Sequence, residues 1–146
     1  MEEITLFVKL LQSTISPIVL ISGVGLILLS LTNRLARTID RSRKLVYELE
    51  NDNSVDSEKK RVQLGILFKR SKILKNSIVS ISFSILSSSL IILILLIMNL
   101  FKIDLEWLGV LFFFLSIIGI ILSAIFLFID VSLTLKALEF EVEGHI

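Results

Sequence analysis

Three intervals of the chain contain no charged residue, and each of them is apolar along most of its length. They comprise residues 10–33, 76–101 and 107–129, which are 24, 26 and 23 residues long. An α-helix needs roughly 20 residues to cross the hydrocarbon core of a bilayer, which is about 30 Å thick. A soluble domain would instead place charges on every exposed helix face. The pattern therefore predicts three membrane-spanning helices.

The first of these helices has a start signal within its apolar interval. Ser16 is a favourable N-cap, and Pro17 is favourable in a first helical turn. The apolar residues before Ser16 recur at helical spacing, which is typical of a helix lying in a membrane interface. We therefore expect a short interfacial helix over residues 1–15 and the first spanning helix over residues 16–33.

The segment between the first two spans is polar but keeps a helical apolar face. This segment, residues 34–75, has one glycine and no proline, and its turn-forming residues gather at 51–54. We expect it to form a helical hairpin that projects from the membrane. The second span is then expected over residues 76–101. The third is expected over 107–130 and continues as a helix over 131–146.

Basic residues are concentrated in the same segment. Twelve of the fifteen Lys and Arg residues lie in 34–75 together with six acidic residues, so this segment carries a charge of +6 while the whole chain carries +1. Positively charged loops of this length stay on the cytoplasmic side. The predicted fold class is thus all-α, an integral protein of the cell inner membrane with three transmembrane helices. The first two extend into a cytoplasmic helical hairpin, with the N-terminus outside and the C-terminus in the cytoplasm.

The amino-acid composition argues against several classes of function. The chain has no cysteine and one histidine, and its spans offer neither a nucleophile with a base nor a convergent pair of acids. We therefore expect no enzymatic activity, no metal site and no cofactor. Nucleic-acid binding is not expected either, because the basic segment alternates bases with acids and lacks exposed aromatic residues for stacking.

Small residues repeat every seven positions along the first span. Ser16, Gly23 and Ser30 form this seam, and Ile27 lies on the same stripe. Small residues let membrane helices approach closely, and a seven-residue repeat keeps one face turned toward a partner through a left-handed crossing. We expect this seam to be a contact between copies of the chain or the lining of a pore. Ordinary packing against another helix is the alternative.

The same stripe continues as basic residues beyond the span, at Arg34, Arg37, Arg41 and Lys44. Several copies arranged around an axis would form a narrow passage that opens into a ring of these cations, which would attract anions. Alternatively, the four side chains contact anionic lipid headgroups at the cytoplasmic surface and fix the topology. Both roles make them candidate anion-binding or lipid-binding residues.

The third span carries a matching repeat that ends in an acid. Ser116, Ser123 and Asp130 are spaced by seven residues. A carboxylate at the end of an apolar span is unfavourable in free energy unless it is paired with a cation or hydrated. Asp130 should lie at about the same depth in the membrane as Arg34 and Arg37. We therefore predict a salt bridge between Asp130 and Arg34 or Arg37. The alternative is a carboxylate that emerges into water at the end of the span.

A stripe of serines follows one face of the second span. Serine hydroxyls can donate hydrogen bonds to carbonyls of their own helix. Such a stripe therefore costs little free energy in lipid and still presents polar groups to a neighbouring helix. Helix packing and a hydrated path both remain open as explanations. The residues concerned are Ser77, Ser80, Ser84 and either Ser87 or Ser88.

One run of the chain is distinctive, SPIVLISGVGLILLSLTNRLARTIDRSR at residues 16–43. It resembles the signature of a bacterial membrane-protein family, domain of unknown function 2721. The most specific part is the first span with the Asn-Arg and Asp-Arg pairs that follow it. The resemblance extends over the whole chain and implies one span, a basic helical loop and two further spans, but it implies no activity. It directs attention to Pro17, Gly23, Gly25, Asn33, Arg34, Arg37, Asp40 and Arg41.

Two hypotheses for function follow from these patterns. The first is a homo-oligomeric pore or channel-like assembly, with the first span near the axis and a collar of arginines at the cytoplasmic mouth. The second is a non-conducting membrane scaffold or regulator whose basic cytoplasmic hairpin binds anionic lipid or a partner protein. Membrane lipids, anionic headgroups on the cytoplasmic side and further copies of the chain are the expected partners.

Overall fold

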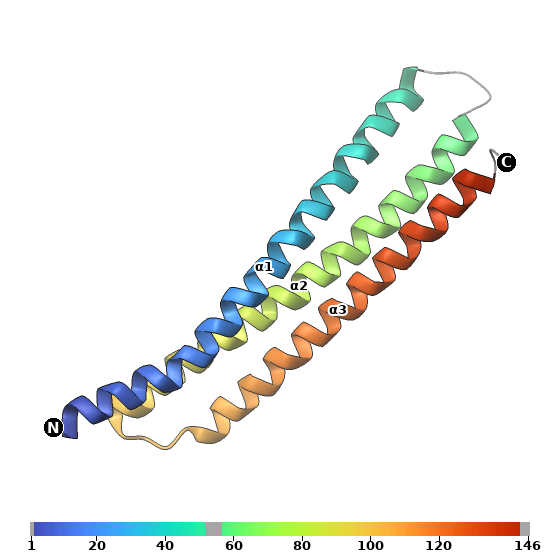
Figure 1. Ribbon diagram of the computed structural model, residues 1–146. Helices are drawn as coiled ribbons and strands as arrows, with labels where there is room; N and C mark the ends of the chain where they lie inside the picture. Colours follow the sequence, from blue (N-terminus) through green and yellow to red (C-terminus); the bar gives the residue numbers. More distant parts are fainter. Residues whose placement is uncertain (1, 52–56, 144–146) are drawn as a thin grey trace. The chain divides into compact units, whose positions relative to one another are not determined.

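Three long helices make up the computed structural model, which describes residues 2–51 and 57–143, with side chains over 4–50 and 57–136 (Figure 1). The helices are α1 (Glu2–Asn51), α2 (Ser57–Phe101) and α3 (Glu106–Glu143). Each helix contains a stretch that is long and apolar enough to cross a membrane. The protein is therefore all-α and has the helices of a multi-pass membrane protein.

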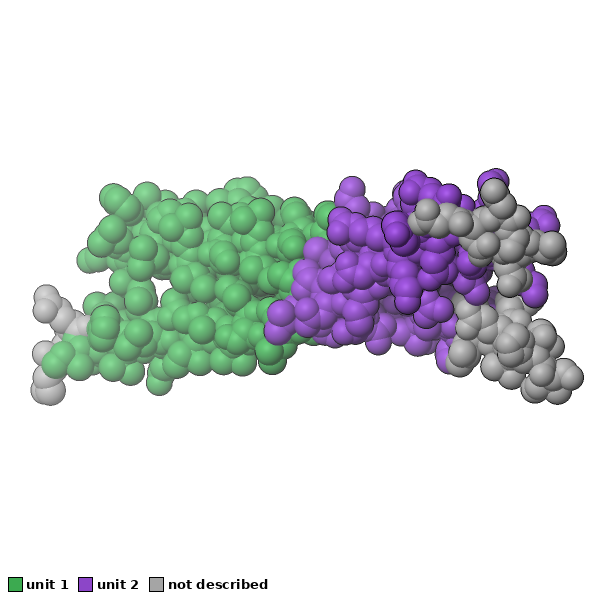
Figure 2. All heavy atoms as spheres, turned by 90° about the horizontal axis from the view of Figure 1, so that it is seen from above, with its two compact units in different colours: residues 1–28, 79–122 green, residues 29–78, 123–146 purple. Residues whose placement is uncertain are grey.

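Two compact units divide the chain, and each takes a section of all three helices (Figure 2). Unit 1 combines residues 1–28 with 79–122, and unit 2 combines residues 29–78 with 123–146. Within each unit the section of α2 runs antiparallel to the sections of α1 and α3, because consecutive helices reverse direction (Figure 1). Contacts inside each unit therefore join parts of the chain that are distant in sequence.

Helix α1 is longer than the predicted first span. It runs without interruption through Ser16 and Pro17, so the helix start predicted there is not found. Proline removes only one backbone hydrogen bond, the one to the carbonyl four residues earlier, and membrane helices tolerate such a loss. A position of residues 1–15 in the membrane interface stays a prediction.

The connection between α2 and α3 has well-defined ends. Helix α2 stops at Phe101 because Lys102 adopts a φ of 53°, in the left-handed region that commonly terminates helices. Before α3, the Asp104 carboxylate accepts a hydrogen bond of 3.3 Å from the backbone N–H of Glu106, as a residue that caps a helix start does. The third helix then continues beyond Asp130 to Glu143.

Part of the predicted architecture falls outside the described residues. The predicted turn at 51–54 lies there almost entirely, because residues 52–56 are not described. The end of the predicted C-terminal extension, residues 144–146, lies there as well, and the side chains of 137–143 are not described.

In unit 1, serines and a glycine form the contact between α2 and α3. The hydroxyls of Ser84 and Ser88 lie 2.9 and 2.7 Å from the hydroxyl of Ser116, and all three residues are buried. The backbones also approach closely, because a Cβ atom on Gly119 would lie 2.9 Å from the carbonyl oxygen of Ser80. Small residues permit this approach, and the hydroxyls satisfy each other where lipid offers no hydrogen bonds.

In unit 2, the same type of contact continues between α2 and α3. The Ser77 hydroxyl donates to the carbonyl of Ser123 at 2.8 Å and lies 2.9 Å from its hydroxyl. Helix α1 contributes Leu31, Thr38 and Leu45, which are spaced by seven residues and are all buried. A seven-residue repeat keeps one helix face in contact with its neighbours over several turns.

Polar residues are about as common as apolar ones among the buried positions whose side chains are described. Nine polar or charged residues are buried against eight large apolar ones, and 36 large apolar residues are exposed, counted over the described side chains. This distribution is expected where the surroundings are lipid, because apolar side chains gain nothing by turning inward. The serines of α2 at positions 77, 84, 87 and 88 are at most 1% exposed, so packing is the explanation that the structure supports for this stripe.

Replacing Gly119 by alanine should destabilise the protein by about 1–3 kcal/mol, because the added Cβ would overpack the α2–α3 contact. The matched control is Gly109→Ala on the same helix, since a Cβ there meets no atom within 4 Å. Thermal unfolding in detergent measures both. Equal melting temperatures for the two variants would contradict the close contact.

Candidate functional site

A single buried carboxylate lies at the centre of the candidate site. Asp130 follows Ser123 by seven residues on α3 and therefore shares the face that packs against α2. Its side chain is 0% exposed. A buried carboxylate is stable only with cationic or hydrogen-bonding partners.

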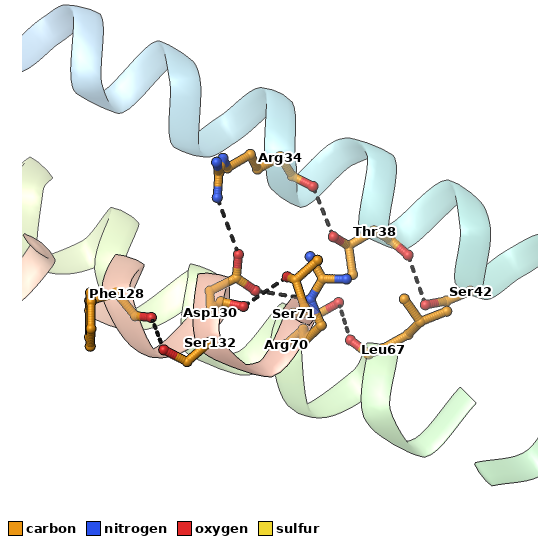
Figure 3. A network of polar contacts seen from close by, with 10 residues as sticks. Arg34, Thr38, Ser42, Leu67, Arg70, Ser71, Phe128, Asp130 and Ser132 are labelled. Atoms are coloured by element: carbon orange, nitrogen blue, oxygen red, sulfur yellow. Dashed lines mark hydrogen bonds and ion pairs between the residues drawn. The ribbon is translucent and has the colours of Figure 1, made fainter. Parts of the chain in front are cut away.

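Asp130 obtains its partners from the other two helices of unit 2 (Figure 3). On α2, Arg70 donates from its Nε to the Asp130 Oδ1 atom at 3.1 Å, and this arginine is 19% exposed. On α1, the Arg34 Nη1 atom lies 3.6 Å from the Asp130 Oδ2 atom, and this arginine is 40% exposed. The carboxylate thus links α1, α2 and α3 through charges of opposite sign.

The sequence predicts a salt bridge between Asp130 and either Arg34 or Arg37, and the structure contains the one with Arg34. Arg34 lies within ion-pair distance of the carboxylate. No ion pair joins Arg37 to another residue within the described part of the chain, and its side chain is exposed. Arg34 is three residues after Leu31 and four before Thr38, both buried, so it lies at the edge of the packed face of α1.

Sequence reasoning missed Arg70, which makes the shorter of the two contacts. A signal for it exists in the heptad spacing of α2, where Arg70, Ser77 and Ser84 are seven residues apart. Helix α3, which is antiparallel to α2, has the same seven-residue spacing at Ser116, Ser123 and Asp130. Aligned antiparallel, these two series give Ser84 with Ser116, Ser77 with Ser123 and Arg70 with Asp130, which are the contacts observed.

Next to this ion pair, unit 2 contains a cavity of about 350 Å³. Four of its nine lining residues are arginines and none is acidic. Of the four predicted anion-binding residues, Arg34, Arg37 and Arg41 line the cavity, whereas Lys44 is exposed and does not. The lining consists of Arg34, Arg37, Thr38, Arg41, Leu67, Arg70, Val131, Thr134 and Leu135.

The hydrogen-bond donors of this cavity are mainly guanidinium groups. The Thr38 hydroxyl donates to the carbonyl of Arg34 at 2.9 Å, and the Thr134 hydroxyl donates to the carbonyl of Asp130 at 2.8 Å. Each hydroxyl has a single hydrogen, so neither threonine has a donor left for a bound molecule. The arrangement can therefore hold an anion through its arginines.

The predicted seam of α1 lies outside the buried face of that helix. Ser16, Gly23, Ile27 and Ser30 are all exposed, and a Cβ atom on Gly23 would meet nothing within 4 Å. The buried face of α1 runs instead through Val24 and the heptad positions that follow it. In one chain, therefore, these small residues lie outside the buried face of the helix.

Within residues 4–50 and 57–136, whose side chains are described, no three His, Cys, Asp or Glu side chains gather where they could hold a metal ion.

Comparison with known proteins shows a match to a protein family. The family described as "Protein of unknown function (DUF2721)" matches residues 14–140, which include most of all three helices and every residue of the candidate site. No curated protein matches the chain, and no solved structure does.

Replacing Asp130 by alanine should destabilise the protein by about 3–5 kcal/mol, because Arg70 would keep a largely buried charge without its partner. The double variant Asp130→Ala with Arg70→Met should lose less than the sum of the two single losses. Asp40→Ala is the matched control, since this carboxylate is exposed, and it should change stability by less than about 0.5 kcal/mol. Thermal unfolding in detergent measures all of these variants. Additive losses would contradict a coupled pair.

Proposed function

Because the chain belongs to the DUF2721 family, which is of unknown function, we propose a function from the geometry of its own residues. The protein assembles from several copies in the membrane, with α1 nearest the axis, and forms a channel-like path for anions. One observation carries this proposal, the exposed seam of Ser16, Gly23, Ile27 and Ser30.

The contrast between two sets of small residues supports assembly. The small residues of α2 and α3 are buried against each other, as Ser84 and Ser116 illustrate. Those of the α1 seam have the same seven-residue spacing, yet in a single chain they are exposed. Small seams in membrane helices favour close contact with another helix, and large side chains normally face the lipid. A second copy of the chain is therefore the partner that suits the seam.

The charge at the end of the seam supports an anion path. Continuing by seven residues from Ser30, the stripe reaches Arg37 and Lys44, which are both exposed. A single chain of three helices does not enclose an aqueous path, but several copies with this stripe at the axis would. Rings of arginine and lysine favour anions in a pore.

Orientation is part of the proposal. Residues 34–75 carry most of the basic residues and lie in the cytoplasm, where α1 and α2 extend beyond the charge-free intervals as a helical hairpin. The N-terminus lies outside and the C-terminus inside, in the inner membrane. Support for the hairpin comes from Lys60, whose Nζ atom is 3.6 Å from an Oε2 atom of Glu48 on the other helix.

A second candidate function is a non-conducting scaffold or regulator that binds a partner protein. A groove of about 900 Å³ in unit 2 favours it, because the groove lies between α1 and α2 beyond the charge-free intervals. Its walls include the exposed apolar side chains Ile39, Val46, Tyr47 and Phe68. Exposed apolar surface outside lipid is typical of protein interaction sites.

Conductance distinguishes the two candidates. Purified protein in planar bilayers should pass anions across a salt gradient, and Arg37→Glu should invert the sign of the reversal potential, because it replaces a ring of positive charge by a negative one. Arg43→Glu is the matched control, since Arg43 is exposed on the same helix but lies outside the stripe. It should leave the sign unchanged.

Two results would contradict the conducting assembly. One is the absence of conductance from protein whose oligomeric state is intact, at every voltage tested. The other is an equal effect of Arg37→Glu and Arg43→Glu, which would indicate a general surface-charge effect instead of a lumen.

A further inference from the structure

We propose that the cavity of about 350 Å³ in unit 2 is a binding site for a phosphate group, carried by an anionic lipid headgroup or by a free phosphate compound. All of its lining residues come from one chain and one unit. The site therefore does not depend on assembly or on conduction and goes beyond the proposed function.

Charge is the first argument for an anion in this cavity. Four arginines line it, and none of its lining residues is acidic. Asp130 is in ion-pair contact with two of these arginines, Arg34 and Arg70, so a single carboxylate is shared between two guanidinium groups. Arg37 makes no ion pair within the described part of the chain and adds a further positive charge. The net positive charge of these residues favours a ligand that carries one or two negative charges, such as a phosphate ester.

The orientation of the arginines is the second argument. Asp130 holds Arg70 through its Nε, so the other four N–H donors of that guanidinium group remain for a ligand. Because Asp130 is fully buried between the helices, it fixes the plane of Arg70 before a ligand arrives. Asp130 is therefore a positioning residue. Guanidinium groups bind phosphate oxygens in pairs, and a phosphate has enough oxygens to accept from several arginines at once.

Size and surroundings are the third argument. The cavity holds roughly ten waters at about 30 Å³ each, which is enough for a phosphate and the atoms attached to it. Leu67, Val131 and Leu135 add apolar lining suited to the carbon atoms of an ester. Arg34 directly follows the first charge-free interval, and lipid phosphates lie at that boundary of the hydrocarbon. Both sources of a phosphate group can therefore reach the site.

Two binding measurements on the full-length protein test the proposal and separate the sources. In phosphatidylcholine nanodiscs, titration with inorganic phosphate followed by calorimetry reports a free phosphate ligand. In nanodiscs that contain phosphatidic acid, native mass spectrometry reports lipid that stays bound after the protein is released. Binding in either measurement is expected.

Arg37→Gln is the decisive variant, because Arg37 lines the cavity but takes no part in the contacts of Asp130. It should weaken binding roughly tenfold, which is the loss expected for one charge-assisted hydrogen bond. Arg43→Gln removes the same charge from the same helix at a residue that lines the other groove, and it should change the affinity less than about twofold. Unfolding temperatures equal to the wild type verify that both variants are folded.

The outcomes have distinct meanings. Phosphate binding that Arg37→Gln weakens and Arg43→Gln spares identifies a free phosphate ligand. Phosphatidic acid binding with the same pattern, without binding of inorganic phosphate, identifies a lipid headgroup. Absence of both kinds of binding, or equal loss in the two variants, overturns the proposal, since equal loss is what a merely basic surface would give.

Discussion

Asp130 imposes the constraint on which unit 2 depends, because a carboxylate with no exposed surface must be compensated by charges from its own protein. It obtains one partner from α2 and one from α1, so the three helices are fixed to each other at one depth. The same requirement applies in weaker form to the buried serines, which pair across the α2–α3 contact. Polar groups that lipid cannot satisfy thus determine which helix faces meet.

This constraint has a consequence for α1. The buried serines of α2 and α3 pack against each other. Helix α1 contributes mainly Leu31, Thr38 and Leu45, which are spaced by seven residues, to the packed interior of unit 2. Its own small seam is left on the surface, next to arginines that line an open cavity. Assembly through the seam and anion binding at the cavity are therefore separate uses of one helix.

Much of the fold is predictable from the sequence, because lipid acts as a solvent that excludes charge and three charge-free intervals reveal the three helices. The site is less predictable. Heptad spacing places Asp130 toward α2, but Arg70 emerges as its partner only when the two helices are aligned antiparallel. Arg34 is selected over Arg37 by the rotation of α1 about its axis, which packing decides. The helix through Pro17 was missed because a proline often marks a helix start, whereas here the chain continues the helix past it.

Thiol cross-linking tests the central claim, that the seam of α1 faces other copies of the chain. The protein has no cysteine, so single cysteines can be placed without a background. Treated in membranes with a short bismaleimide, Gly23→Cys and Ser30→Cys should yield covalent dimers, whereas Leu29→Cys should not, because it is exposed about 100° round the helix from Ser30. Dimers from Leu29→Cys alone, or from none of the three, would contradict the account.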